Sequence, residues 1–212
     1  MRPKEVLFLR HGATAFTEPP ERFCGHCNPS LTEAGRAQVQ LLADHFGRNG
    51  APELILTSPL DRAVQTAEVL SHTLSLRVEI EHDLKETDFG IWEGLTKDQA
   101  CAAAREVFHA WESNPSAVGP PGGEPLHMAL QRAQRLRGVV LGHGELTLLL
   151  VSHKSFLRIA ICHWLGLDPA LYRTLLDLEP AGLGCVSLTG QSGTLRLLNW
   201  TPTLESVTHR DP

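Results

Sequence analysis

Short runs of apolar residues alternate along the chain with longer segments in which apolar residues recur every three or four positions. The short runs are typical of buried strands, and the longer segments are typical of amphipathic helices. Strands are expected at about 6–9, 53–57, 77–80 and 147–152, followed by an antiparallel pair at 184–188 and 194–199 joined by the turn residues 190–193. This alternation predicts βαβ units and a mostly parallel sheet covered on both faces, which is an α/β fold.

Helices are expected over about 32–47, 59–74, 96–111, 124–141 and 155–165. Three of them have a recognisable first turn: Thr32 is a favourable cap, Pro59 suits a first helical position, and Thr96 with Gln99 can form a capping box. A segment rich in proline and glycine, 114–125, interrupts the pattern. Because it is only about a dozen residues long, we interpret it as a loop at the edge of a site and not as a linker between domains.

Composition limits the class of protein. A chain of 212 residues, of which 42% are hydrophobic, can bury the core of one domain. The net charge of -5 and the scattered lysines and arginines argue against nucleic acid as a partner. The apolar run 6–9 is too short for a signal peptide, and no segment approaches the roughly 18 apolar residues of a membrane span. We therefore expect a cytoplasmic protein that does not enter a membrane.

Charged and ionisable residues follow the four expected parallel strands. Arg10 and His11 come directly after the first, Arg62 lies just beyond the second, Glu86 follows the third, and His153 ends the fourth. The carboxyl ends of parallel strands meet at one edge of a sheet, where ligands bind. Arginines bind phosphate oxygens, one histidine can attack phosphorus while the other shares the developing charge, and a carboxylic acid can protonate the leaving oxygen. Each residue alone is weak evidence, but together they indicate phosphoryl transfer without a metal.

The tetrapeptide Cys24-Gly25-His26-Cys27 has the spacing of the dithiol in oxidoreductases of the thioredoxin type. Such a dithiol normally follows a core strand and opens a helix, whose dipole lowers the pKa of the first thiol. Here a charged, proline-rich segment precedes it and Pro29 follows it, so we favour a loop with incidental thiols. Disulfide exchange and a zinc site remain alternatives, and the sequence does not show whether Cys24 and Cys27 form a disulfide.

Six segments carry a resemblance to a known family. They are LRHGAT (9–14), LTEAGRAQ (31–38), TSPLDRAVQTAE (57–68), LKETDFGIWEG (84–94), GGE (122–124) and VSHKSFLR (151–158). In these segments, and in their order, the chain resembles the histidine phosphatase superfamily, in the branch that includes cofactor-dependent phosphoglycerate mutases. The resemblance covers most of the chain, from residue 7 to about 158.

The resemblance implies a three-layer α/β/α sandwich with a mostly parallel central sheet, of the phosphoglycerate mutase type. It also implies roles for the five residues at the strand ends. His11 matches the histidine that becomes phosphorylated, Arg10 and Arg62 match the phosphate-binding arginines, His153 matches the second histidine of the pocket, and Glu86 matches the proton donor. No metal and no cofactor is implied.

Further positions of the site are also implied by the resemblance. Thr17 stands where many relatives have asparagine, and Gly25 belongs to a loop beside the site, so both are expected to contact substrate. Lys154 and Ser155 replace glycines that many relatives have after the second histidine, and the lysine is either a further cation near phosphate or a solvated residue. We expect a single domain, 1–212, with a variable lid-like insertion at about 88–130, and a homodimer is a candidate oligomeric state.

The function expected from these observations is hydrolysis of a small phosphorylated metabolite by a histidine phosphatase-type phosphomonoesterase, through a phosphohistidine intermediate. A phosphoglycerate mutase is the main alternative, but a mutase needs basic residues on its lid, and the segment 88–130 contains only Lys97 and Arg105. A phosphoester-binding domain without catalysis and a dithiol redox protein are weaker alternatives. Candidates for contact with the substrate, each equally explained by packing, are Phe16, Arg22, Phe23, Trp92, His109, Trp111 and His127.

Overall fold

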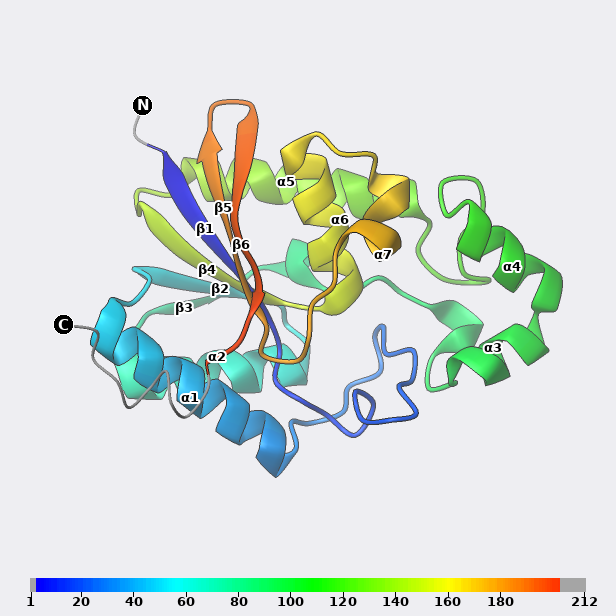
Figure 1. The fold of residues 1–212 in the computed structure, drawn as a ribbon, viewed down its shortest axis with the longest axis horizontal. Coiled ribbons are helices and arrows are strands. Elements are labelled where there is room, and N and C mark those ends of the chain that lie inside the picture. The colour runs from blue at the N-terminus through cyan, green and yellow to red at the C-terminus, as the bar shows by residue number, and fades with distance from the viewer. Residues whose placement is uncertain (1–2, 203–212) are drawn as a thin grey trace.

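The computed structural model describes residues 3–202, which form a six-stranded sheet with helices on both faces (Figure 1). The strand order is β3-β2-β4-β1-β5-β6, with β1 at Lys4–Arg10, β2 at Leu54–Thr57, β3 at Val78–Ile80, β4 at Thr147–Ser152, β5 at Leu183–Thr189 and β6 at Ser192–Trp200. The first four strands are parallel to one another, whereas β5 and β6 are antiparallel to their neighbours. The predicted α/β class and the predicted antiparallel pair are confirmed.

Successive side chains of the central strands point to opposite faces of the sheet, so each strand contributes to two cores. Phe8 and Leu150 pack with α5 (Leu126–Gly142) and α6 (Lys154–Leu165) on one face. Leu9 and Val151 pack with α1 (Glu33–Asn49) and α2 (Asp61–Leu74) on the other. Figure 1 shows the sheet between these two helical layers. The strands are therefore apolar along their whole length, as the short apolar runs of the sequence predict.

The helix starts follow the local sequence to within two residues, and α5 begins at Leu126 where about 124 was expected. Thr32 caps α1 by accepting a hydrogen bond from Gly35 N, as predicted. The helix expected from Pro59 begins two residues later, at Asp61, because Leu60 has an extended backbone (ψ 135°) and acts as the N-cap. None of the helices within residues 3–202 combines the length and the apolar character that crossing a membrane requires.

The segment expected to be one helix over 96–111 contains two. Thr96 and Gln99 do form the predicted capping box of α3 (Lys97–Ala103), but Ala104 leaves helical geometry (φ −153°, ψ 62°) and α4 (Arg105–Ser113) starts in a new direction. The break lets α4 bury Phe108 and Trp111 in a third apolar cluster, separate from the two cores at the sheet. The remaining short helices are η1 (His82–Leu84), η2 (Gly90–Trp92), η3 (Pro169–Leu171) and α7 (Tyr172–Leu175).

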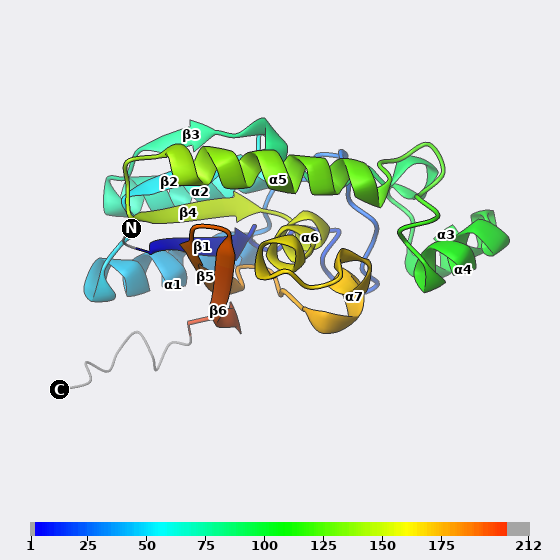
Figure 2. The ribbon, with the colours of Figure 1, turned by 90° about the horizontal axis from the view of Figure 1, so that it is seen from above.

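The carboxyl ends of the parallel strands point to one side of the molecule. Figure 2 shows β1 and β4 directed toward the side on which α6, α7, α3 and α4 lie. The small pair α3–α4 stands apart from the sheet in both views (Figures 1 and 2). Residues that follow β1, β2 and β4 therefore emerge facing this pair.

Candidate active site

The sheet brings all five predicted residues to one edge. Arg10 is the last residue of β1 and His11 follows it, Arg62 lies in the first turn of α2, and His153 stands between β4 and α6. The rings of His11 and His153 have centroids 5.2 Å apart, and Arg62 Nε lies 3.2 Å from His11 Nε2. Each of the five, including Glu86, is at most 4% exposed. The predicted convergence of the strand-end residues is therefore present in the structure.

His11 is oriented by a hydrogen bond on each side of its ring. Nδ1 lies 2.8 Å from Gly12 O, and a carbonyl oxygen can only accept, so Nδ1 carries the hydrogen. Nε2 accepts from Arg62 Nε, so its lone pair is free of a proton. Burial lowers the pKa of His11 well below its usual value, and the charges of Arg62 and Arg10 lower it further. His11 is thus a neutral imidazole with an unprotonated Nε2, which is the form a nucleophile needs.

His153 is held behind His11 by Ser58. Its Nε2 lies 2.8 Å from Ser58 Oγ, and the ring is completely buried. Burial is the main cause of a pKa well below the usual value, and the charge of Arg62 is the next. Ser58 lies in the segment 57–68 that carries the resemblance, but its role as the partner of His153 was not predicted from the sequence.

Arg62 is surrounded by backbone carbonyls of the loop 24–27. Nη1 donates to Cys27 O at 2.8 Å, and Nη2 donates to Gly25 O at 2.8 Å and to Cys24 O at 3.1 Å. A guanidinium group fits this arrangement because its donors lie in one rigid plane. The loop therefore fixes the direction in which Arg62 points toward His11.

Glu93 also holds this loop, and its role was not predicted from the sequence. Its carboxylate accepts from His26 N at 2.6 Å and from Cys27 N at 2.7 Å. Gly25 is required at this contact because a Cβ there would lie 2.2 Å from Glu93 Oε1 and 2.6 Å from Thr87 O. Gly25 holds Arg62 through its carbonyl and is absent from the described residues that line the cavity, so its predicted contact with substrate stays a prediction.

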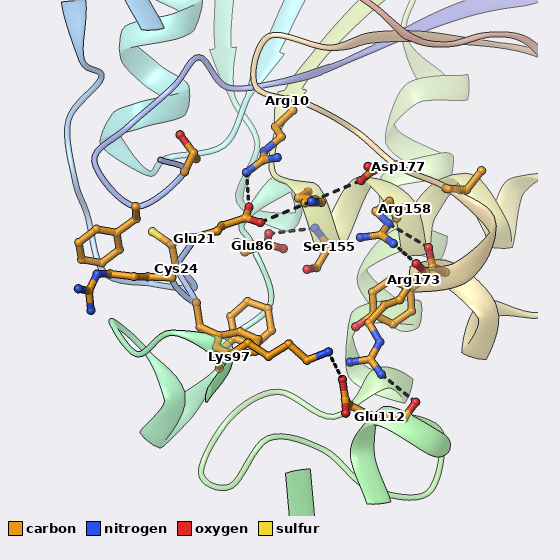
Figure 3. Close-up of a pocket in the computed structure, with 18 of the residues that line it drawn as sticks. Arg10, Glu21, Cys24, Glu86, Lys97, Glu112, Ser155, Arg158, Arg173 and Asp177 are labelled. Carbon is orange, nitrogen blue, oxygen red and sulfur yellow. Dashed lines mark hydrogen bonds and ion pairs between the residues drawn. The ribbon is translucent and has the colours of Figure 1, made fainter. Parts of the chain in front are cut away.

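Glu86 lies at the N-terminus of α6. Its Oε1 accepts from Phe156 N at 2.8 Å and from Thr87 N at 2.9 Å, and its Oε2 accepts from Ser155 N at 3.0 Å. The bonds from Ser155 N and Phe156 N satisfy donors that the first turn of a helix leaves without partners. The carboxyl group is thereby fixed on the wall of the cavity, where Figure 3 shows it next to Ser155.

Arg10 and Lys154 share acidic partners at this wall. Arg10 donates to Leu178 O at 2.8 Å and to Glu21 Oε1 at 3.0 Å. Lys154 Nζ lies 3.7 Å from Glu21 and 3.4 Å from Asp177. Lys154, the first residue of α6, is thus a cation paired with carboxylates at the cavity wall, and its predicted position near phosphate stays a prediction.

Thr17 lines the cavity, but its hydroxyl group is engaged within its own turn. Oγ1 donates to Thr14 O at 2.9 Å and accepts from Thr14 N at 2.9 Å. Its predicted contact with substrate therefore stays a prediction.

A cavity of about 820 Å³ is lined by His11. Lys97 and Glu112 of the α3–α4 pair also line it (Figure 3). Of the residues predicted to contact substrate, Phe16, Arg22, Phe23 and Trp111 line it. Trp92 is fully buried in the third apolar cluster, and neither His109 nor His127 is among the lining residues that the structure describes. Three further cations line the cavity, namely Lys97, Arg158 and Arg173, and none of them was predicted to contact substrate.

Those three cations are held by neighbouring groups. Lys97 forms an ion pair with Glu112 at 2.7 Å, and the guanidinium carbon of Arg173 lies 3.8 Å from the centre of the Trp111 ring. Arg158 donates to Tyr172 O at 2.9 Å. Arg158 and Arg173 come from α6 and α7, outside the segment 88–130 in which the sequence argument counted basic residues.

Cys24, His26 and Cys27 are not arranged as a set of zinc ligands in the part of the chain that the structure describes. His26 turns away from the thiols, with Nε2 3.2 Å from Glu86 O and Nδ1 3.7 Å from Asp88. Within the described range 3–202, no group of three His, Cys, Asp or Glu side chains is arranged to hold a metal ion.

The comparisons with known proteins agree with this geometry. The family model of the histidine phosphatase superfamily (branch 1) matches residues 6–201. The chain belongs to this family. A bifunctional protein of Mycobacterium tuberculosis is 38% identical over 204 residues, which are 94% of this chain and 54% of that protein. The chain thus spans about half the length of the curated relatives that it matches first.

Two proteins named as phosphatases match this chain over a larger share of their own length. Phosphoserine phosphatase 1 of Hydrogenobacter thermophilus is 31% identical over 165 residues, 77% of each protein. The crystal structure of the α-ribazole phosphatase from Shigella flexneri superposes with a TM-score of 0.82 at 25% identity, covering 92% of this chain and 96% of that one. The sandwich described above is accordingly the phosphoglycerate mutase-like fold of the family, as the resemblance implies.

Proposed function

We propose that this chain is a phosphomonoester hydrolase that acts through a phosphohistidine at His11. One observation carries the proposal: His11 is a buried, neutral imidazole whose unprotonated Nε2 lies beside Arg62, in the wall of a cavity that Arg10 and Glu86 also line. The relatives named as phosphatases support it.

The first step is attack of His11 Nε2 on phosphorus. Arg10 and Arg62 bind the phosphate oxygens, and His153 adds a hydrogen bond to the charge that develops on them. Glu86 donates a proton to the oxygen of the departing alcohol. The bond between His11 and phosphorus forms as the bond between phosphorus and the ester oxygen breaks.

The second step returns the enzyme to its starting state. Glu86, now a carboxylate, takes a proton from a water molecule, whose oxygen attacks the phosphohistidine. Inorganic phosphate leaves and His11 is again neutral. The hydrogen bonds from the first turn of α6 keep Glu86 in place for both roles.

The substrate is a small phosphorylated metabolite, since the cavity of about 820 Å³ is within the range of sites for small molecules. Relatives named for phosphoserine and for α-ribazole phosphate differ in the group they release. The proposal assigns contact with that group to Phe16, Arg22, Phe23 and Trp111, because these four of the predicted residues line the cavity.

A phosphoglycerate mutase is the alternative, and the cavity contains cations from outside the segment 88–130, such as Arg158 and Arg173, that could bind a second acidic group. Lys97, Lys154 and Arg173 are, however, already bound by acidic or backbone partners. The relatives named as phosphatases favour hydrolysis. Release of phosphate and isomerisation of 3-phosphoglycerate, measured on one preparation, distinguish the two activities, and a dominant isomerase activity contradicts the proposal.

The proposal is tested by His11→Ala with p-nitrophenyl phosphate as the substrate. Turnover is expected to be abolished, because no other neutral imidazole among the described residues has Nε2 beside Arg62. The matched control is His109→Ala on the exposed side of α4, which is expected to keep normal turnover. A His11→Ala protein with near-normal rates would refute the phosphohistidine mechanism.

A further inference from the structure

The two thiols of the loop 24–27 are in contact. Cys24 Sγ and Cys27 Sγ are 3.4 Å apart without being bonded, and both cysteines are half-buried. Cys24 lines the cavity, and Figure 3 shows it on the wall opposite Arg158. A small reagent that enters the cavity therefore reaches Cys24 first. This pair has no part in the hydrolysis described above.

The backbone of the same two residues holds Arg62. Cys24 O, Gly25 O and Cys27 O accept three of its hydrogen bonds, and Glu93 fixes Cys27 N from behind. A change in the distance between Cys24 and Cys27 therefore moves the carbonyl groups that hold Arg62, the arginine that contacts His11.

We propose that Cys24 and Cys27 are a reversible dithiol–disulfide pair whose oxidation displaces Arg62 and lowers the phosphatase activity. The activity part of this inference rests on the proposed function. In a disulfide the sulfurs are about 2.05 Å apart, so they must approach from 3.4 Å within a four-residue turn. The carbonyls of that turn hold Arg62 at 2.8–3.1 Å, and such bonds weaken steeply when they lengthen or bend.

The two thiols are unequal in a way that suits stepwise oxidation. The hydrogen bond from the Cys27 thiol lowers the pKa of Cys24, and the charge of Arg62 acts in the same direction against the effect of burial. The pKa of Cys27 is raised, first by the same hydrogen bond and then by burial. Cys24 is accordingly the thiol that forms the attacking thiolate.

The oxidant is a low-molecular-weight disulfide. The Cys24 thiolate attacks one of its sulfurs and releases the first thiolate, which takes up the proton that Cys24 lost. Cys27 then attacks Cys24 Sγ in the mixed disulfide, its proton goes to the second thiolate, and the protein disulfide forms. Two electrons pass from the cysteines to the oxidant, which leaves as two thiols.

The test uses the full chain treated with oxidised glutathione and then with dithiothreitol. Oxidation is expected to lower the number of free thiols from five to three and the mass by two hydrogens, with no glutathione retained. The kcat/KM for p-nitrophenyl phosphate is expected to fall ~10-fold or more, because a misplacement of about 1 Å in a site has effects of this size. Dithiothreitol is expected to restore the five free thiols, the original mass and the original kcat/KM.

The controls separate this pair from the other cysteines. The double variant Cys24→Ser, Cys27→Ser is expected to keep its activity under oxidant, relative to its own reduced form. Cys101→Ser removes a half-exposed cysteine outside the loop and is expected to lose activity as the unmodified chain does. Glutathione retained on Cys24 without an internal disulfide overturns the inference, as does a disulfide that leaves kcat/KM unchanged.

An inactive reduced chain distinguishes a failure of the proposed function from a failure of the redox inference. If the reduced chain hydrolyses no phosphomonoester, the proposed function is refuted, and the inference is then decided by titration calorimetry with inorganic phosphate. Weaker phosphate binding in the oxidised form supports displacement of Arg62, and equal binding in the two forms overturns it.

Discussion

Arg62 connects three parts of the site through one planar group. It touches the ring of His11, it lies close enough to both histidines to lower their pKa values, and it is held by three carbonyls of the loop 24–27. The sequence predicted that Arg62 belongs to the site, because this residue lies just beyond the end of a strand. The carbonyl groups that orient Arg62 could not be predicted, because every residue has a backbone carbonyl and the residue type does not show which ones bind.

Replacing Arg62 with alanine tests its electrostatic role. The kcat/KM for p-nitrophenyl phosphate is expected to fall about 10²–10³-fold, because a fixed donor to the developing charge is lost. The acid limb of the pH–rate profile is expected to move to higher pH, since Arg62 is the largest charge that lowers the pKa of His11. Arg36→Ala, on the exposed side of α1, is the control and should change neither. An acid limb that stays in place would contradict this account of His11.

The lowered pKa values of the two buried histidines, His11 and His153, make the free energy of unfolding depend on pH. Their pKa values in the folded chain lie well below 6.5, so the unfolded chain binds more protons as the pH falls through 6.5. The free energy of unfolding is therefore expected to decrease on acidification. Between pH 7.5 and 5.5 the loss is at most about 1.4 kcal/mol per histidine.

Urea unfolding at the two pH values measures this loss. His153→Gln is expected to reduce it by about half, since one of the two contributing groups is gone. His82→Gln, which removes an exposed histidine at η1, is expected to leave it unchanged. Equal pH dependence in all three proteins would show that the buried histidines do not control it.

The elements are placed by close packing between β1 and α1. A Cβ on Gly12 would lie 2.5 Å from Gly35 O, and a Cβ on Gly35 would lie 2.2 Å from Ala13 O. The segment after β1 thus runs directly across the first turn of α1, and this contact positions His11. The starts of α1 and α3 were predicted correctly because caps are local, whereas the break at Ala104 was missed because α4 turns to bury Phe108 and Trp111 in a distant cluster.

Two glycines of the same helix give a matched test of that contact. Gly35→Ala is expected to destabilise the chain by about 1–3 kcal/mol, because backbone atoms of Ala13 block the added methyl group. Gly47→Ala meets its nearest atom at 3.7 Å and is expected to stabilise α1 by about 0.5–1 kcal/mol. Denaturant unfolding measures both, and similar effects at the two positions would argue against the close approach.

The whole molecule combines a sandwich with two cores and a smaller unit that has its own cluster. Trp92, Phe108 and Trp111 pack together with α3 and α4, away from the sheet (Figure 2). The cavity lies between this unit and the strand ends, so the unit supplies one wall of the site. The lid-like insertion at 88–130, the homodimer and the cytoplasmic location stay predictions.

Trp92→Ala is expected to loosen this unit selectively. Removal of a fully buried tryptophan costs about 3–5 kcal/mol, and the loss falls on a cluster that is separate from the cores of the sheet. Hydrogen exchange is expected to accelerate in α3 and α4 and to stay slow in β1 and β4. Trp164→Ala, at the equally buried tryptophan of α6, is the matched variant and should accelerate exchange at the sheet. Uniform acceleration in both proteins would contradict the separation of the clusters.

The sequence by itself determined the α/β class, most strands and helices, and the five residues that meet at the sheet edge. It did so because hydrophobic periodicity, caps and the position just after a strand are local properties. The tertiary structure alone decided which groups surround those residues. It set the three backbone carbonyls of the loop 24–27 that bind Arg62 and the contact of Glu93 with the same loop. It also brought the cations of α6 and α7 to the cavity. These contacts join segments far apart in the chain, and their geometry is set by packing, which residue order does not reveal.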